Sequence, residues 1–394
     1  MISVFFFLTY LYLINLWFKS HKSILLLPLI IGGLIIIFYR IELSLLDMDV
    51  YFSDALYYYE KSFESFSNLK IFEYAFYLKI INLFSIVYFP LEINIVNFLI
   101  FQISCLLMLK LILISAKFNI EAKNKIIYRS SLFIFCNPFL IISLIRSVKD
   151  ASFLFLIILF IYLIIKFDKI YIKIILTLLF SYVLLPIRPW SVILTFSILF
   201  YDIFLRIKTS KGLLIRSILL VCAISLILII PIYFIDNIDT LLKWYEIAER
   251  GGITDTFDLS FKSRIIGPLK LLFSPGIPRL LNPSKYFTYH TITLIISLFI
   301  GIFLNYCLLT RLIDFKRIMT SIKNNFHIFL ISLIGIVIYS FSYAGSVEFR
   351  IKAIILSPLF FIIIASIPQN KFIINNSNII ILFMILFLSS IISI

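Results

Sequence analysis

Two carboxylates beside tyrosine hydroxyls make one polar segment of this sequence a candidate reaction site. Asp49 and Asp54 follow the second apolar run and stand close to Tyr51 and Tyr57. A carboxylate within reach of a substrate hydroxyl can accept its proton and act as a general base. The alternative is that these acids belong to a solvated loop, as most exposed carboxylates do. We predict Asp49 and Asp54 as the catalytic residues.

Basic side chains form a second candidate set. They stand in turns that are expected to face outward, where a membrane protein should carry few Lys and Arg residues. The predicted substrate-binding residues are Arg146, Lys149, Arg188, Lys262, Arg264, Arg279 and Arg350. Arg146, Lys149 and Asp150 have the spacing i, i+3, i+4, so they share a face if a helix continues there. Each cation alone is explained by a side chain that reaches toward lipid headgroups. As a set, they favour an anionic ligand with phosphate oxygens.

Composition indicates how these residues are positioned. The 394-residue chain is 62% hydrophobic and only 14% charged, and its mean hydropathy is +1.11. Soluble domains carry about a quarter charged residues, so a soluble globule is excluded. Apolar stretches of spanning length must satisfy their backbone internally, which predicts helices. We expect an all-α polytopic membrane protein, a single transmembrane domain over 1–394, with about 12 transmembrane helices.

The apolar runs and the charges between them give the expected topology. The expected spans are 3–18, 23–39, 92–114, 127–145, 151–166, 170–187, 190–205, 217–235, 289–309, 326–344, 351–367 and 374–394. Alternate loops are rich in Lys and Arg and poor in acids, which predicts that they are cytoplasmic. The net charge of +15 is therefore a topology signal, and we expect no nucleic-acid partner. The larger outward loops are 40–91 and 236–288.

Segment 71–89 is apolar enough to span, but spanning would place the basic downstream loops outside. We expect it to lie in the outer interface or to re-enter the membrane. Both chain ends then face outward.

Motifs for metals and cofactors are not visible. The cysteines Cys105, Cys136, Cys222 and Cys307 all fall within expected spans at unrelated spacing, which is typical of packing residues. The sequence has no P-loop, no dinucleotide fingerprint and no metal-spaced His/Cys cluster. We predict no metal and no cofactor.

An ordered series of landmarks carries a family resemblance over roughly residues 40–360. The landmarks are the acidic, Tyr-bearing loop (Asp47, Asp49, Tyr51, Asp54), Asn137-Pro138 before the turn at 146–150, Arg188-Pro189, Leu272-Phe273-Ser274-Pro275, and Glu348-Phe349-Arg350 with Pro358. In these the chain resembles the bacterial polysaccharide repeat-unit polymerases, the Wzy and EpsG-like proteins of the C-type membrane glycosyltransferases. It departs from them at Lys149-Asp150, where relatives often have Arg, and at Arg279, where they often have Trp.

The resemblance implies a polymerase that joins undecaprenyl-pyrophosphate-linked oligosaccharide repeat units at the periplasmic face of the bacterial inner membrane, for O-antigen or a related surface polysaccharide. Membrane lipid and a chain-length regulator protein are the other implied partners. One alternative is another polyprenyl-phosphate-dependent glycosyltransferase or an O-antigen ligase. An alternative of a different class is a flippase or transporter for the lipid-linked oligosaccharide. Transporters usually show two similar halves with polar groups near mid-membrane, which favours the enzyme here.

Overall fold

The computed structural model describes residues 1–45, 47, 49–50, 54–69, 71–85, 87–115, 118–146, 149–206, 265, 267–269, 271–272, 292–343 and 349–368. All regular elements in these residues are helical and none is a strand, which confirms the all-α fold class. The main helices are α1 (Ile2–Trp17), α2 (Lys22–Leu45), α3 (Asp54–Lys61), α4 (Tyr74–Leu83), α5 (Phe89–Ser115), α6 (Ile120–Ser130), α7 (Pro138–Arg146), α8 (Asp150–Lys166), α9 (Ile170–Leu184), α10 (Ser191–Arg206), α16 (Ile292–Leu309), α17 (Phe315–Asn324), α18 (Phe326–Tyr343) and α19 (Phe349–Ser366). Short turns are η1 (Lys19–His21), η2 (Phe66–Asn68), η3 (Ser131–Phe135, π-helical) and η5 (Thr310–Ile313).

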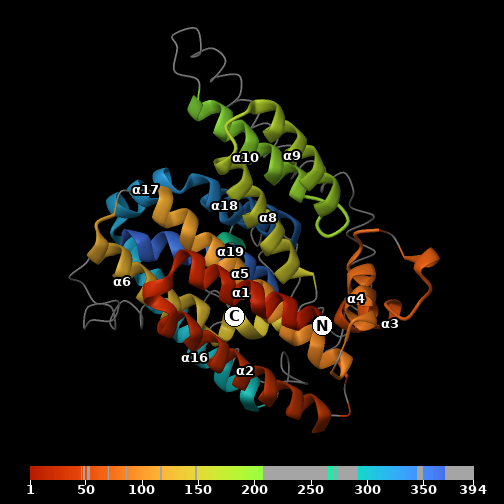
Figure 1. Cartoon of the computed structure of the whole chain (residues 1–394). Helices are drawn as coiled ribbons and strands as arrows, with labels where there is room; N and C mark the ends of the chain where they lie inside the picture. The colour runs from red at the N-terminus through yellow and green to blue at the C-terminus, as the bar shows by residue number, and fades with distance from the viewer. Residues whose placement is uncertain are drawn as a thin grey trace.

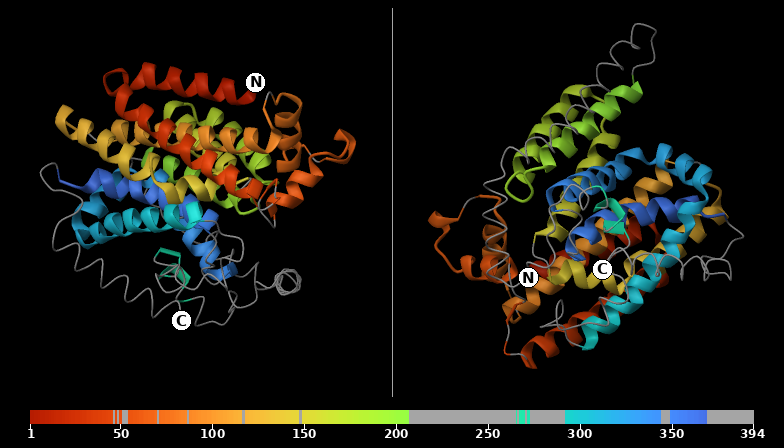
Figure 2. Two further views of the ribbon diagram at one scale, coloured as in Figure 1. Left: turned by 90° about the horizontal axis from the view of Figure 1, so that it is seen from below. Right: turned by 180° about the vertical axis from the view of Figure 1, so that it is seen from behind.

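The helices pack side by side around α5, with α3 and α4 beyond one end (Figures 1 and 2). α5 is apolar and buried along most of its length, as expected of a helix at the centre of a membrane bundle. By length and composition, two described helices can cross a membrane: 19–45, which is α2 with η1, and α5. Counting each of two bent helix pairs as one span raises this number to four. The predicted spans 217–235 and 374–394 lie outside the described residues.

The direction of α1 relative to α5 fixes the path of the chain between them. Near their starts, the backbone N–H of Ser3 donates to Glu92 at 3.0 Å. Near their other ends, the ammonium of Lys110 lies 5.7 Å from the centre of the Trp17 ring. The two helices are therefore parallel, so the chain runs the length of the bundle once between them, and α2 makes that passage. α4 has 10 residues and a length of about 15 Å, half of a bilayer core.

The two ends of the bundle differ in the elements that cover them. At the α3–α4 end, helices α2, α7, α9 and α18 finish and α5, α8, α10 and α19 begin. At this end, the side-chain amide of Asn94 near the start of α5 donates a hydrogen bond of 3.1 Å to the carbonyl of Ile145 near the end of α7. At the α17 end, the guanidinium of Arg129 donates to the carbonyls of Ile367 and Pro368. The expected outward turns thus meet at one end and the expected cytoplasmic turns at the other.

The expected span 127–145 is broken into α6, η3 and α7, and the bend is 52°. Pro138 has no N–H and cannot continue the preceding helix. The backbone groups freed by the break find side-chain partners. The Asn137 side chain accepts from the first turn of α7 and donates to Asn305 at 2.8 Å, and Gln102 donates to the carbonyl of Phe135 at 3.0 Å. Polar partners of this kind are what allow a helix to break inside a bundle.

Two further features differ from the expected pattern. α2 continues through Arg40 to Leu45, so the first loop begins later than residue 40. α17 was not expected; it lies at 108° to α18 across the end of the bundle. One side of α17 is apolar and carries Ile318, which is buried against the bundle, and Phe315, which is exposed. The other residues of the helix are mostly basic or polar. The basic segment that contains α17 is therefore a short amphipathic helix.

Candidate functional site

The first loop folds back over the end of the bundle as two short helices. Lys61 at the end of α3 forms an ion pair of 2.8 Å with Glu73, the residue before α4. The hydrogen bond that Lys61 donates to the Glu73 carboxylate raises the pKa of Lys61 above its usual value. Tyr59 of α3 stacks on Phe89 at the start of α5, with the ring centres 5.5 Å apart. α3 and α4 are thereby joined to one another and to the bundle.

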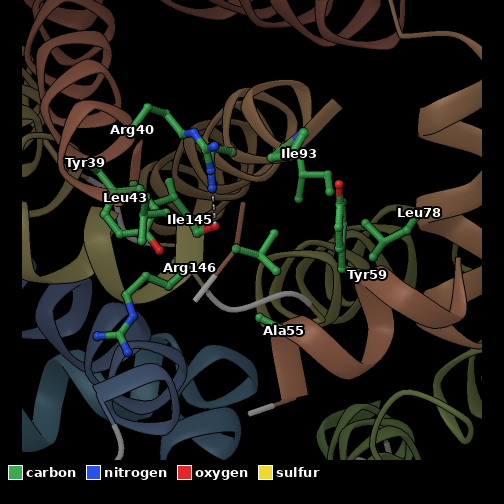
Figure 3. A pocket seen from close by; sticks show the side chains of 12 residues that line it. Tyr39, Arg40, Leu43, Ala55, Tyr59, Leu78, Ile93, Ile145 and Arg146 are labelled. Atoms are coloured by element: carbon green, nitrogen blue, oxygen red, sulfur yellow. Dashed lines mark hydrogen bonds between the residues drawn. The ribbon is translucent and has the colours of Figure 1, made fainter. Parts of the chain in front are cut away.

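A small pocket lies under α3, and two arginines line it. Arg40 comes from α2 and Arg146 from the last turn of α7; Asn94 of α5 and Tyr59 of α3 are also in its wall. Figure 3 shows the guanidinium of Arg146 pointing away from that of Arg40. The cavity measures about 20 Å³. That volume holds one or two water molecules, at about 10–15 Å³ each, and is far too small for a pyrophosphate.

Asp49 stands at this pocket, although it does not line it. Its backbone carbonyl accepts a hydrogen bond of 2.6 Å from Arg40, and its side chain is exposed. Burial raises the pKa of the Tyr59 phenol, and the Asp49 carboxylate raises it further. Asp49 is thus close to both Arg40 and Tyr59. Asp54 is the first residue of α3, and its side chain lies outside the described part of the structure.

Lys149 connects the turn after α7 to the first loop. Its ammonium donates to the hydroxyl of Tyr58 at 3.0 Å and lies 5.2 Å from the centre of that ring. The Tyr58 ring in turn packs edge-on against Tyr74 of α4, with centroids 5.7 Å apart. Burial, then Tyr77 and Asp150, raise the pKa of Tyr74. A predicted substrate-binding cation is therefore held among tyrosines next to a buried acid.

Arg188 forms a buried ion pair with Asp150. Asp150 is fully buried at the start of α8, and Arg188 is only 9% exposed. The guanidinium also lies 5.8 Å from the centre of the Tyr339 ring in α18. The indole N–H of Trp190 donates to the Tyr339 hydroxyl at 3.3 Å. The turn between α9 and α10 thus meets α8 and α18 around one arginine.

The predicted residues divide into those that meet and those that the structure does not describe. Arg146, Lys149 and Arg188 lie at the α3–α4 end together with Asp49. Helix α7 ends at Arg146 and α8 begins at Asp150, so the shared helical face expected for this turn does not form. The side chain of Arg350 is outside the described part of the structure, and so are residues 262, 264 and 279 in full.

Three participants were not among the predicted site residues: Arg40, Asp150 and Tyr339. An acid next to a long apolar run was the available signal for Asp150, since a charge at a membrane helix end needs a partner. Arg40 and Tyr339 were missed because a basic or tyrosine side chain near the end of an apolar helix is also typical of contact with lipid headgroups.

The arrangement offers cations, phenols and exposed carboxylates, Asp49 among them, at a single end of an apolar bundle. That set suits an anionic ligand whose phosphate oxygens accept from guanidinium groups. Among the described residues, no group of three or more His, Cys, Asp or Glu could hold a metal ion. Comparisons with protein-family models, with curated proteins and with solved structures find no match for this chain.

Proposed function

We propose that the protein is a membrane glycosyltransferase that polymerises undecaprenyl-pyrophosphate-linked oligosaccharide repeat units at the outer face of the bacterial inner membrane. The product in this proposal is O-antigen or a related surface polysaccharide. The chain crosses the membrane about a dozen times as one domain, with the α3–α4 end outward. The observation that supports the proposal best is that Arg40 of α2, Arg146 and Lys149 at the turn after α7, and Arg188 after α9 all lie at that end.

The proposed reaction assigns a task to each group. Arg40 and Arg146 bind the pyrophosphate of the donor, whose negative charge grows as the bond to the sugar breaks. Asp49 takes the proton of the acceptor hydroxyl as its oxygen bonds to the anomeric carbon of the donor. Undecaprenyl pyrophosphate leaves, and the proton remains on the carboxyl group. Lys149 adds positive potential around the same end, and Arg188, paired with Asp150, holds the start of α8 beside it.

Substrate entry requires α3 to move. The cavity of about 20 Å³ is closed partly by Ala55 and Tyr59 of that helix. Displacing α3 removes both from the wall and opens the two arginines to the outer surface. The ion pair between Lys61 and Glu73 ties α3 to α4, so the two helices would move together. After substrate entry, α3 and α4 would close again over the site. Closure keeps the reacting bond of the donor away from water.

The deciding experiment is a gel analysis of surface glycan in a deletion strain. Loss of a polymerase leaves lipid A core capped by one repeat unit, whereas loss of a flippase or ligase leaves bare core. The strain is complemented with the wild-type gene, with Arg40→Ala, with Arg146→Ala and with Lys125→Ala. Lys125 is an exposed cation at the α17 end and serves as the matched control. Bare core in the deletion strain rejects the polymerase.

Protein amount in the membrane is measured for every variant, so that lost polymer can be separated from lost protein. Shortened glycan in both arginine variants at normal abundance supports the pyrophosphate contact. Normal glycan in both variants removes Arg40 and Arg146 from the proposed site.

A further inference from the structure

α1 and α2 meet at the turn η1 and diverge from it, as Figure 2 shows. α1 packs along α5, and α2 diverges from α1 while it also packs on α5 at Gly32; near its start, Ser131 of η3 donates to the carbonyl of Ile24 at 2.6 Å. The Tyr10 hydroxyl donates to the carbonyl of Leu25 at 2.6 Å and joins the two helices at the base of the wedge. Above this base lies an open groove of about 380 Å³. Its walls are Leu11, Tyr12, Ile14, Asn15, Lys22 and Leu26.

The groove is polar at the end near the turn η1 and apolar further from it. Lys22 begins α2 and Asn15 is close to the end of α1, so both polar groups stand near the turn. Leu26 lies one helical turn, about 6 Å, further along α2, and Leu11 is the same distance back along α1. Ile14 is buried and forms the floor, whereas Tyr12 is 63% exposed. A ligand that fits has a polar, charged end at the turn and an apolar remainder.

The charge around the polar end is positive. Lys19 of η1 adds a second ammonium three residues before Lys22. His21 faces Asn124 of α6 at 3.0 Å, and the nearest acid along that helix, Glu121, is paired with Lys125 at 2.6 Å. The ligand that complements this end is therefore an anion. The volume lies in the range of pockets that bind small molecules or lipid headgroups with their first carbons.

We propose that this groove binds an anionic phospholipid from the leaflet at the α17 end. The lipid phosphate lies against the ammonium of Lys22, with Asn15 and the Tyr12 hydroxyl near the glycerol esters. The acyl chain follows Leu11 and Leu26 toward the centre of the bilayer. Basic pockets between membrane helices at the cytoplasmic side have this chemistry. The lipid is neither donor nor acceptor in the proposed polymerase reaction, because the groove lies at the opposite end from that site.

Native mass spectrometry of the purified full-length protein tests the site, with phosphatidylglycerol and phosphatidylcholine as probes. Lys22→Gln should weaken phosphatidylglycerol binding about fivefold, the loss that one basic residue near a membrane surface represents. Leu26→Trp fills the apolar part without changing charge and should also weaken it. Lys22→Arg keeps the charge and should bind nearly as well as the wild type.

Lys169→Gln is the matched control, because it removes one cation at the same end of the bundle but on α9, away from the groove. It should leave binding unchanged. Thermal unfolding of each variant identifies any that fail to fold. If Lys22→Gln is one of them, Lys22→Arg and Leu26→Trp are compared with the wild type instead. The proposal is overturned if Lys22→Gln and Leu26→Trp both bind phosphatidylglycerol like the wild type. It is equally overturned if the two lipids bind alike in all variants, which would mean annular lipid only.

Discussion

Removing one partner of the Asp150–Arg188 ion pair should destabilise the protein strongly. Asp150 is fully buried and Arg188 nearly so, and breaking a buried pair by deleting one charge costs about 3–5 kcal/mol. Asp150→Leu leaves the guanidinium without its carboxylate, so its cost lies in that range. Arg188→Met should cost less, about 3 kcal/mol, because a stranded carboxyl can take up a proton and become neutral.

The double variant Asp150→Leu with Arg188→Met separates pairing from burial. It removes both charges and replaces them with apolar side chains, a change that is often nearly neutral for buried pairs. We expect it to cost under about 2 kcal/mol, so the coupling energy in the cycle formed with the two single variants exceeds about 4 kcal/mol. The assay is equilibrium unfolding of the purified protein in mixed micelles as the denaturing detergent fraction rises.

The exposed pair Glu121–Lys125 is the control cycle. Its atoms are 2.6 Å apart, but the two side chains are 62% and 37% exposed. Exposed helix pairs at this spacing contribute about 0.3–0.5 kcal/mol. A coupling for Asp150–Arg188 as small as that of the control would refute the assignment of a buried pair. Glycan length in the double variant then reports on function: stable protein without polymer shows that the Arg188 charge acts on substrate, and normal polymer shows that it does not.

Three further predictions concern topology, packing and binding. Cysteines introduced at the exposed positions 60 and 319 should be labelled from opposite sides of the membrane, with 60 accessible from outside; labelling of both from one side contradicts the topology. Gly301→Ala should destabilise by about 1–3 kcal/mol, because its Cβ would lie 2.3 Å from Cβ of Phe139, whereas Gly33→Ala meets nothing within 4 Å and should be tolerated in the same unfolding assay. Arg146→Ala should lower polymerase activity about ten- to a hundredfold, and Arg146→Lys should recover part of it, since a lysine keeps the charge but not the bidentate geometry. Equal activity of all three proteins in a glycan-length assay removes the phosphate contact.

The helix ends could be predicted from the sequence wherever charges bound an apolar run. α8 is the clearest case, because Asp150 and Lys166 mark both of its ends and the structure differs from the prediction by one residue. The break before Pro138 could not be predicted in the same way. A proline inside a membrane helix either kinks it or breaks it, and the outcome depends on partners such as Gln102 and Asn305, which are distant in sequence.

The candidate site was predictable as a set of residue types but not as a set of contacts. Local spacing gave Arg146, Lys149 and Asp150 a common helical face, but α7 ends at the first of them and each side chain takes a different direction. Pairing of Asp150 with Arg188 depends on how α8 lies against the end of α9, which no local pattern encodes. α17 had a usable signal, since Phe315, Ile318, Met319 and Ile322 follow the i, i+3, i+4, i+7 pattern. The high density of basic residues around that pattern favoured a loop instead.

A row of buried polar side chains on α9 bears on the choice between an enzyme and a transporter. A transport path offers polar groups near mid-membrane that a passing substrate can engage. On α9, Lys173 forms an ion pair with Asp202 of α10, and the Ser181 and Thr195 hydroxyls share a hydrogen bond of 2.6 Å. Arg188, beyond the end of α9, pairs with α8. Because each of these groups bonds a neighbouring helix, the row is explained by helix association. The arginine-lined pocket and the Asp49 carboxylate beside it lie together at the α3–α4 end, which favours chemistry at one membrane face over passage through it.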